Sequence, residues 1–190
     1  VEGNATNVEK KWEKTKGSDD VVVAVVDTGV DYTHEDLKDN MWENTYQPKL
    51  RGEYGYDFAN ADTDPMDDEG HGTHCAGIIG AKGDNGVGVS GMNHNVKIMA
   101  LKALDERGSG SDSDLIDAYN YINKAINLGV NVAAINDSWG GEGKSAIFKK
   151  LRIWLEQRAR YLYVQQEMSR QIMMKRLFIR QTMIALIRSV

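Results

Sequence analysis

Apolar residues are grouped along the chain in runs that predict strands alternating with helices. Residues 21–26 form an unbroken, mostly β-branched apolar run, which is typical of a strand buried on both faces. Residues 96–104 and 131–136 are two further strand candidates. Between the predicted elements, 39–70 and 82–91 are polar and rich in turn-forming residues, and we expect both to be surface loops.

Three segments are expected to be helical: 7–16, 72–80 and 111–128. The last has the clearest pattern, because apolar residues recur in it at helical spacing (Leu115, Ile116, Tyr119, Ile122 and Ile126). Asp112 or Ser113 is expected to cap its start, and Gly129 is expected to end it. A strand–helix–strand order of this kind indicates a parallel α/β sheet.

Composition narrows the class of protein. The 190 residues are 41% hydrophobic, which is enough for one domain with a core, and the net charge of −5 does not favour a nucleic-acid partner. No apolar run reaches the roughly 18 residues that a membrane span requires. One cysteine, Cys75, excludes an internal disulfide framework. No basic-then-apolar leader follows Val1, so a signal peptide is neither seen nor excluded.

Charge and composition change abruptly near residue 150. Residues 149–190 contain 10 Lys and Arg against 2 Asp and Glu, whereas residues 1–148 contain 13 against 26. Residues 151–190 also lack Gly, Pro, Asn and Asp altogether. We therefore divide the chain into a domain at 1–150 and a basic tail at 151–190.

Two residues could carry catalytic chemistry. Asp27 directly follows the strand predicted at 21–26, and reactive groups of parallel sheets gather at the carboxyl ends of strands. His71 stands at the start of the small-residue helix predicted at 72–80. Either residue alone is more commonly structural. Together they match two members of a triad in which a carboxylate orients an imidazole and the imidazole takes the proton of a nucleophile.

Three motifs occur in a fixed order: D-T-G-V-D at 27–31, H-G-T-H-C-A-G at 71–77 and N-D-S-W-G-G at 136–141. They resemble the aspartate, histidine and substrate-cleft segments of the subtilisin-like serine peptidases (subtilases), whose triad order is Asp, His and then a later Ser. The resemblance covers about residues 1–150. It implies an incomplete three-layer α/β/α sandwich with a parallel sheet, endopeptidase action on polypeptides, secretion, and catalytic roles for Asp27 and His71.

The resemblance also implies binding residues. Six of them correspond to the two edges of the cleft that hold the substrate backbone, namely Gly108, Ser109 and Gly110 on one side and Ser138, Trp139 and Gly140 on the other. Four correspond to a structural calcium site: Asp36, Asn85, Val87 and Val89. Carboxylate, amide and backbone oxygens are the ligands that calcium prefers. No organic cofactor is implied.

Other residues near the motifs have competing interpretations. His71 and His74 could suggest a metal pair, but the H-E-x-x-H pattern is absent and a structural His74 is favoured. Cys75 is expected to be a small buried residue, with a reactive thiol beside His71 as the alternative. The aspartates at 62, 64, 67 and 68 are expected to form a solvated loop face, with a second cation site as the alternative.

Two subtilase segments are missing. Neither A-A-G-N, for the oxyanion asparagine, nor G-T-S-M-A, for the nucleophilic serine, occurs in the chain, so we expect the isolated chain to be inactive. Read from the third base of each codon with the first two of the next, residues 164–168 can encode A-A-G-N, because Gln166-Glu167 permits only Gly or Arg and Glu167-Met168 only Asn or Asp.

We therefore hypothesise a frameshift near Lys150 or Leu151, in the gene or in its sequencing. It would explain the missing residue types, the basic charge and the lost motifs together. Two alternatives remain open: a basic amphipathic helix over 151–190 that binds a partner or an anionic membrane, and a non-catalytic fragment that binds peptides.

Overall fold

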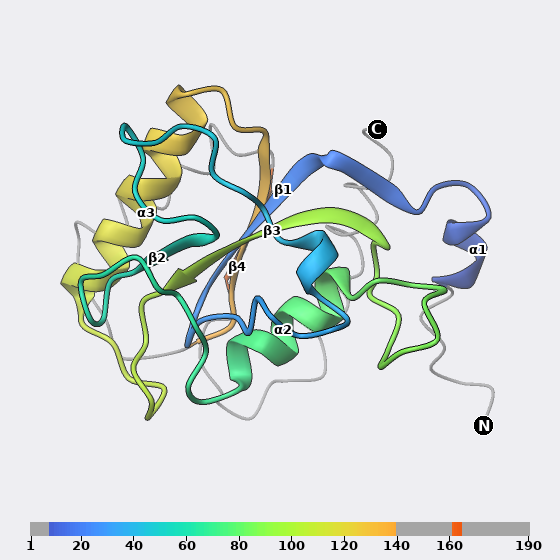
Figure 1. Cartoon of the computed structure of the whole chain (residues 1–190), viewed down its shortest axis with the longest axis horizontal. Coiled ribbons are helices and arrows are strands. Elements are labelled where there is room, and N and C mark those ends of the chain that lie inside the picture. The colour runs from blue at the N-terminus through green and yellow to red at the C-terminus, as the bar shows by residue number, and fades with distance from the viewer. Residues whose placement is uncertain (1–7, 140–160, 165–190) are drawn as a thin grey trace.

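The structure is a computed structural model of the whole chain, which describes residues 8–139 and the backbone of 161–164. Its elements are α1 (Glu9–Trp12), β1 (Gly17–Asp27), the 3₁₀ turn η1 (Lys38–Asn40), β2 (Gly55–Asp57), α2 (His71–Gly80), β3 (Asn95–Lys102), α3 (Asp112–Asn127), β4 (Val132–Asp137) and β5 (Tyr161–Val164). The strands form a parallel sheet in the order β2-β3-β1-β4-β5. Figure 1 shows β1 crossing the middle of the molecule.

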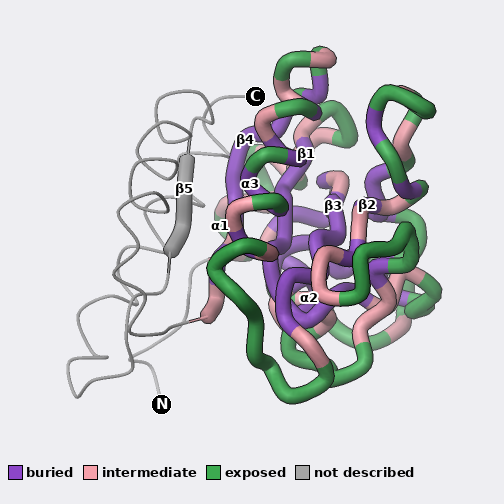
Figure 2. The backbone as a smooth tube through the Cα atoms, turned by 90° about the vertical axis from the view of Figure 1, so that its left-hand side faces the viewer, coloured by how far each residue is buried: buried purple, intermediate pink, exposed green. Residues whose placement is uncertain are grey.

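Alternate residues of β1 face different helices. Val22 and Val26 belong to an apolar cluster that includes Tyr119 of α3, whereas Val23 belongs to a second cluster that includes Ile79 of α2. The apolar run at 21–26 is unbroken because both faces of the strand are covered. The expected three-layer α/β/α sandwich is therefore confirmed. Figure 2 shows burial concentrated on β1, β3 and β4.

The predicted strands and the helices predicted at 72–80 and 111–128 are present, with shifts at their ends, whereas the helix predicted at 7–16 is only the single turn α1 among the described residues. The predicted cap of α3 was wrong. The capping residue is Ser111, whose Oγ accepts from the Asp114 N–H at 3.2 Å while the Asp114 carboxylate accepts from the Ser111 N–H at 3.3 Å. Such a reciprocal pair satisfies two backbone donors at once. Gly129 follows α3 with φ +101°, as expected for a helix stop.

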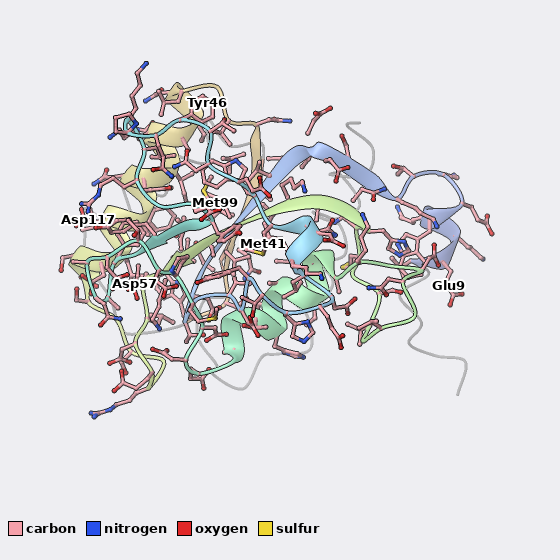
Figure 3. The ribbon with its side chains drawn as sticks, viewed as in Figure 1. Glu9, Met41, Tyr46, Asp57, Met99 and Asp117 are labelled. Atoms are coloured by element: carbon pink, nitrogen blue, oxygen red, sulfur yellow. The ribbon has the colours of Figure 1, made fainter. Side chains whose placement is uncertain are left out.

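The prediction of a surface loop over 39–70 was wrong in part. This segment contains β2, which pairs with β3 at the sheet edge, and the side chains of Met41 and Leu50 are 1% exposed. Figure 3 shows Met41 and Met99 in the middle of the molecule, whereas Glu9 of α1 lies at its edge. Isolated apolar residues among polar ones show no period, so the sequence did not reveal these core positions.

The basic tail lies outside the described residues, apart from the backbone of β5. That segment pairs in parallel with β4, with Ile135 opposite Leu162, so residues 161–164 form a strand and the alternative of a helix is wrong for them. Within the described part of the chain, no helix has the length and apolar character needed to cross a bilayer.

Candidate active site

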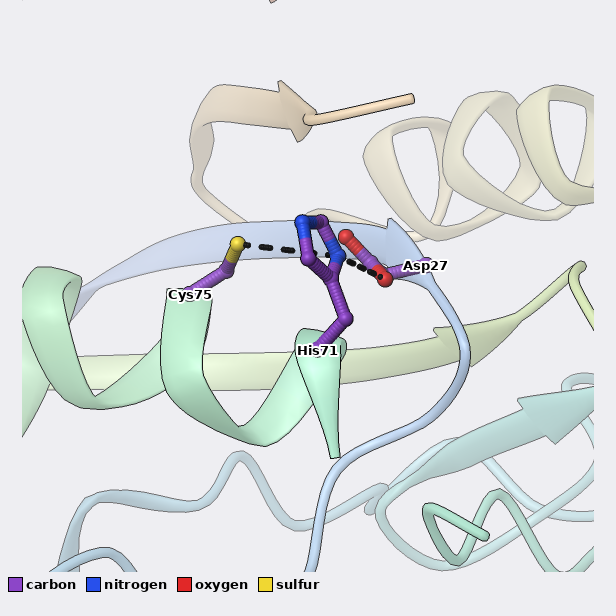
Figure 4. Close-up of side chains that lie close together, drawn as sticks. All are labelled: Asp27, His71 and Cys75. Carbon is purple, nitrogen blue, oxygen red and sulfur yellow. Dashed lines mark hydrogen bonds and ion pairs between the residues drawn. The ribbon is translucent and has the colours of Figure 1, made fainter. Parts of the chain in front are cut away.

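The end of β1 and the start of α2 bring together a buried carboxylate and a partly exposed imidazole. Asp27, the last residue of β1, is fully buried, and the side chain of His71, the first residue of α2, is 45% exposed. Nδ1 of His71 lies 2.7 Å from Oδ1 of Asp27 (Figure 4). The pair is hydrogen-bonded through one ring nitrogen, so the second, Nε2, is left for chemistry at the surface.

Backbone groups hold Asp27 in place. Its Oδ1 accepts a hydrogen bond from the Thr28 N–H at 2.8 Å, and its carbonyl oxygen accepts from the N–H groups of Ala103 and Leu104 at 3.0 and 3.1 Å. Its other carboxylate oxygen, Oδ2, is buried and has no hydrogen-bond partner among the residues described. The carboxylate therefore meets both His71 and the backbone through the same oxygen.

Asp67 organises the approach to α2. Its carboxylate accepts from three N–H groups of the segment 69–73 and from the Thr73 hydroxyl. It also accepts from Thr28 Oγ1 at 2.8 Å, and this oxygen accepts from the Gly72 N–H at 3.0 Å. Burial acts to raise the pKa of Asp67, but the hydrogen bonds outweigh it and the pKa is lowered. Asp67 thus connects the turn after Asp27 to the helix that carries His71.

A glycine allows α2 to approach β1 closely. A Cβ atom at Gly72 would lie 2.0 Å from the carbonyl oxygen of Gly29 and 3.1 Å from Cβ of Asp27. Any side chain at this position would push the helix away from the strand. The second residue of the histidine motif must therefore be glycine for His71 to reach Asp27.

Cys75 lies one helical turn after His71, with its Sγ 4.0 Å from Nδ1 of that ring. Burial raises the pKa of the thiol to about 11, although hydrogen bonds with Ser138 and Asn136 act in the opposite direction. The thiol is therefore protonated near neutral pH, which favours the interpretation as a small, unreactive residue.

The alternatives in which His74 or the aspartates at 62, 64, 67 and 68 bind a metal ion find little support. Over the described residues, one group of His, Cys, Asp or Glu side chains is close enough to share a metal ion, and it consists of Asp27, His71 and Cys75. His74 is exposed and lies outside this group, and the aspartates at 62, 64, 67 and 68 also lie outside it. The prediction that these aspartates form a solvated loop face was wrong for Asp67. Its carboxylate accepts hydrogen bonds from the N–H and the hydroxyl of Thr73 at the start of α2.

The comparisons with known proteins agree with this geometry. A model described as the subtilase family matches residues 18–178. The chain belongs to the subtilase family. A thermophilic serine proteinase of Bacillus sp. (strain AK1) is 46% identical over 116 residues, which are 61% of this chain and 26% of that protein.

A second relative and a solved structure are also similar to this chain, in sequence and in fold respectively. The halolysin-like extracellular serine protease Nep of Natrialba magadii is 40% identical over 118 residues, 60% of this chain and 20% of that protein. The solved structure of the S41 psychrophilic protease matches with a TM-score of 0.64 and 28% identity, over 80% of this chain and 46% of that chain. The chain thus spans about a quarter of these curated subtilases, or less, and under half of the solved one.

The two segments predicted to line the subtilase cleft lie near the edge of the sheet that carries Asp27. Residues 108–110 lie in an exposed loop after β3, where the Asp105 N–H donates to the Ser109 carbonyl at 2.8 Å. Ser138 and Trp139 directly follow β4, and Trp139 packs against the apolar cluster that includes Tyr119 of α3. Gly140 lies outside the described residues.

The four predicted calcium ligands come together beside α2. The side chain of Asp36 is buried, and its two carboxylate oxygens accept from the Asn85 amide and the Val89 N–H, each at 2.8 Å. The Val87 N–H donates to Asn85 Oδ1 at 3.1 Å. Both partners of the Asp36 carboxylate are neutral, so its negative charge is not balanced by a direct ion pair among the described side chains.

One charged residue near Asp27 and His71 was not predicted from the sequence. Lys102 ends β3 in register with Asp27, and its side chain is 1% exposed. The available signal was a single lysine near the end of an otherwise apolar stretch at 98–104. Buried lysines are rare unless they are paired, so such a lysine is worth examining.

Proposed function

We propose that this chain carries the acid–imidazole part of a serine endopeptidase that cleaves polypeptides. The observation that carries the proposal is the 2.7 Å contact between Nδ1 of His71 and Oδ1 of the buried Asp27, with the imidazole half exposed at the carboxyl edge of the sheet. This is the arrangement that a general base requires, because the carboxylate fixes one ring nitrogen and solvent or substrate reaches the other.

The proposed chemistry is acyl transfer. Asp27 holds the proton on Nδ1 and stabilises the imidazolium, while Nε2 of His71 takes the proton of a serine hydroxyl as that oxygen bonds to the scissile carbonyl carbon. Nε2 then gives the proton to the departing amine as the C–N bond breaks. Water repeats the two transfers on the acyl-enzyme, so the base returns to its starting state.

The nucleophile and the oxyanion donor have to be supplied by sequence that this chain does not contain in its present frame. We attribute this to the frameshift near Lys150 or Leu151. Two observations support it: the residue types change abruptly after residue 150, and residues 164–168 read in the shifted frame can encode A-A-G-N. The subtilase match to residue 178 and the strand β5 belong to the present frame, so neither supports a shift.

Substrate is proposed to lie between the loop 108–110 and the segment 138–140. Both segments follow strands that flank β1, so they bracket the edge that carries Asp27. An extended peptide placed between them would pair through its backbone, a mode of binding that accepts many sequences. The name of the Natrialba magadii relative, an extracellular protease, supports a proposed location outside the cell.

A structural calcium ion is proposed at Asp36. The donor set fits, because a buried carboxylate with neutral partners lacks a balancing charge. Asn85 now donates its NH₂ group to Asp36 and accepts from the Val87 N–H, so turning Oδ1 toward an ion beside Asp36 would exchange both hydrogen bonds for a metal contact. The ion would supply charge balance and hold the loop 82–91 against Asp36.

The test compares two proteins with a serine-directed phosphonate probe and an unstructured protein substrate. The 190-residue chain is expected to show neither labelling nor cleavage, since loss of the nucleophile typically lowers kcat by about 10⁶-fold. The same gene with its frame restored after codon 150 and its downstream sequence included is expected to show both, and Asp27→Asn in that protein should lower kcat about 10⁴-fold. Labelling of the 190-residue chain would refute the proposal.

A further inference from the structure

Lys102 is buried, and each of its ammonium protons has a partner. Nζ donates to the Thr28 carbonyl at 2.7 Å, to Oδ1 of Asp68 at 2.5 Å and to the Leu104 carbonyl at 3.1 Å. A lysine ammonium has three N–H donors, so the group is fully satisfied. The Asp68 side chain is 45% exposed, so the ion pair has one buried and one half-solvated partner.

The three partners belong to three segments that converge on the catalytic pair. Thr28 follows Asp27 directly, and Asp68 lies in the segment that enters α2 three residues before His71. Leu104 lies on the chain leaving β3, and its N–H donates to the Asp27 carbonyl at 3.1 Å. One ammonium group therefore joins the end of β1, the end of β3 and the approach to α2.

Thr28 is held from two directions. Its carbonyl accepts from Lys102, and its hydroxyl donates to Asp67, whose carboxylate also accepts from the N–H of Thr73, the third residue of α2. Asp67 and Lys102 thus clamp the same residue between Asp27 and the helix that carries His71. A displacement of Thr28 would move Asp27 relative to the imidazole.

Stability alone does not explain a buried ion pair here. Burying the charge of Lys102 carries a desolvation cost, and apolar replacements of buried ion pairs are often neutral or stabilising. We propose that Lys102 is a positioning residue for the Asp27–His71 pair, which acts by fixing the turn at Thr28. This inference rests on the proposed function only in that it takes the Asp27–His71 pair to be the catalytic one.

The experiment follows the low-field proton NMR resonance of the hydrogen bond between His71 Nδ1 and Asp27 Oδ1 in the 190-residue chain. Two variants remove the clamp: Lys102→Met, which keeps the length of the stem, and Asp68→Asn, which changes only a half-exposed partner and so keeps the fold. The matched control is Lys97→Met on the same strand, whose Nζ donates to the Asp39 carbonyl at 2.8 Å. Thermal unfolding by circular dichroism checks that each protein is folded.

The resonance is expected in the wild type and in Lys97→Met, and is expected to be lost or moved upfield in both clamp variants while they remain folded. If Lys102→Met does not fold, Asp68→Asn decides the result. An unchanged resonance in the folded clamp variants would overturn the positioning role and leave the proposed function intact. Absence of the resonance from the wild type would mean that the Asp27–His71 pair is not formed, which would overturn the proposed function and this inference with it.

Discussion

The two central residues of the candidate site differ in their exposure to solvent. Asp27 is buried and accepts hydrogen bonds from the backbone N–H groups of Thr28, Ala103 and Leu104, and His71 presents its ring to the surface from the first position of a helix. A carboxylate held this way keeps one orientation, so the imidazole that it contacts has one tautomer and one direction of approach. Both residues were predicted from the sequence, because each stands in a short motif and Asp27 directly follows a predicted strand. Asp67 and Lys102 became visible only with the fold, since their partners lie on other elements.

The thiol of Cys75 is expected to react slowly near neutral pH. Because burial raises its pKa to about 11, the reactive thiolate is scarce at pH 7 and increases tenfold with each unit of pH toward that value. The measurement is the rate of iodoacetamide alkylation between pH 7 and 10, with Cys75→Ser as the blank. A rate that levels off near pH 8.5, as for a free thiol, would contradict the burial argument.

Replacing Asp67 with Asn is expected to destabilise the chain by about 1–2 kcal/mol at pH 7, the range typical of a lost helix cap. Because the folded-state pKa of Asp67 is lowered, its contribution is present above its ordinary pKa of about 3.9. The contribution is lost as the pH falls through the lowered value. Urea unfolding at pH 7 and pH 2.5 should therefore show a difference between wild type and variant that shrinks in acid.

Asp117→Asn is the control for this series, since Asp117 is exposed on α3, at the left edge of the molecule in Figure 3. The free energy of unfolding of this variant should stay within about 0.5 kcal/mol of the wild type at both pH values. A difference for Asp67→Asn that is equally large at pH 2.5 would show that shape, and not the charge of the carboxylate, stabilises the start of α2.

At the scale of elements, the regular patterns gave correct predictions and the irregular ones did not. The apolar run of β1 and the spacing within α3 are periodic, and both elements were predicted from the sequence with small errors at their ends. β2 has only three residues, Gly55–Asp57, and its pairing partner β3 begins 38 residues after it ends, at Asn95. A segment this short is a strand because of its neighbour and carries no period of its own.

The start of α3 allows two neighbouring serines to be compared. Ser111→Ala removes the acceptor for the Asp114 N–H and is expected to cost about 1 kcal/mol of stability. Ser113→Ala, at the second residue of the helix, removes a hydroxyl that hydrogen-bonds to Ser111 Oγ but no partner of the backbone, and is expected to change stability by less than about 0.5 kcal/mol. Chemical denaturation of the two variants side by side is the measurement. Equal losses would mean that the capping box does not contribute as the geometry indicates.

At the scale of the whole molecule, the loop 82–91 is joined to Asp36 by the hydrogen bonds from Asn85 and Val89. If calcium binds there, free ion at 100 times its dissociation constant should stabilise the fold by about 2.7 kcal/mol. The melting temperature should therefore rise with calcium chloride and fall with EDTA in the wild type, and should become insensitive to both in Asp36→Asn. Asp62→Asn is the matched control, because Asp62 lies in the exposed acidic loop. A calcium response that survives in Asp36→Asn would exclude this site.

The central place of β1 has a consequence for how the chain folds. Val23 is paired with Ile98, 75 residues further on, and with Ala134, 111 residues further on. During synthesis β1 leaves the ribosome before both of its partners, and its apolar faces stay uncovered until β3 and β4 emerge. Contacts this distant along the chain slow folding and lengthen the time during which strand edges can associate wrongly. The same order of strands that brings Asp27 to the site therefore makes assistance during folding an advantage for this sequence.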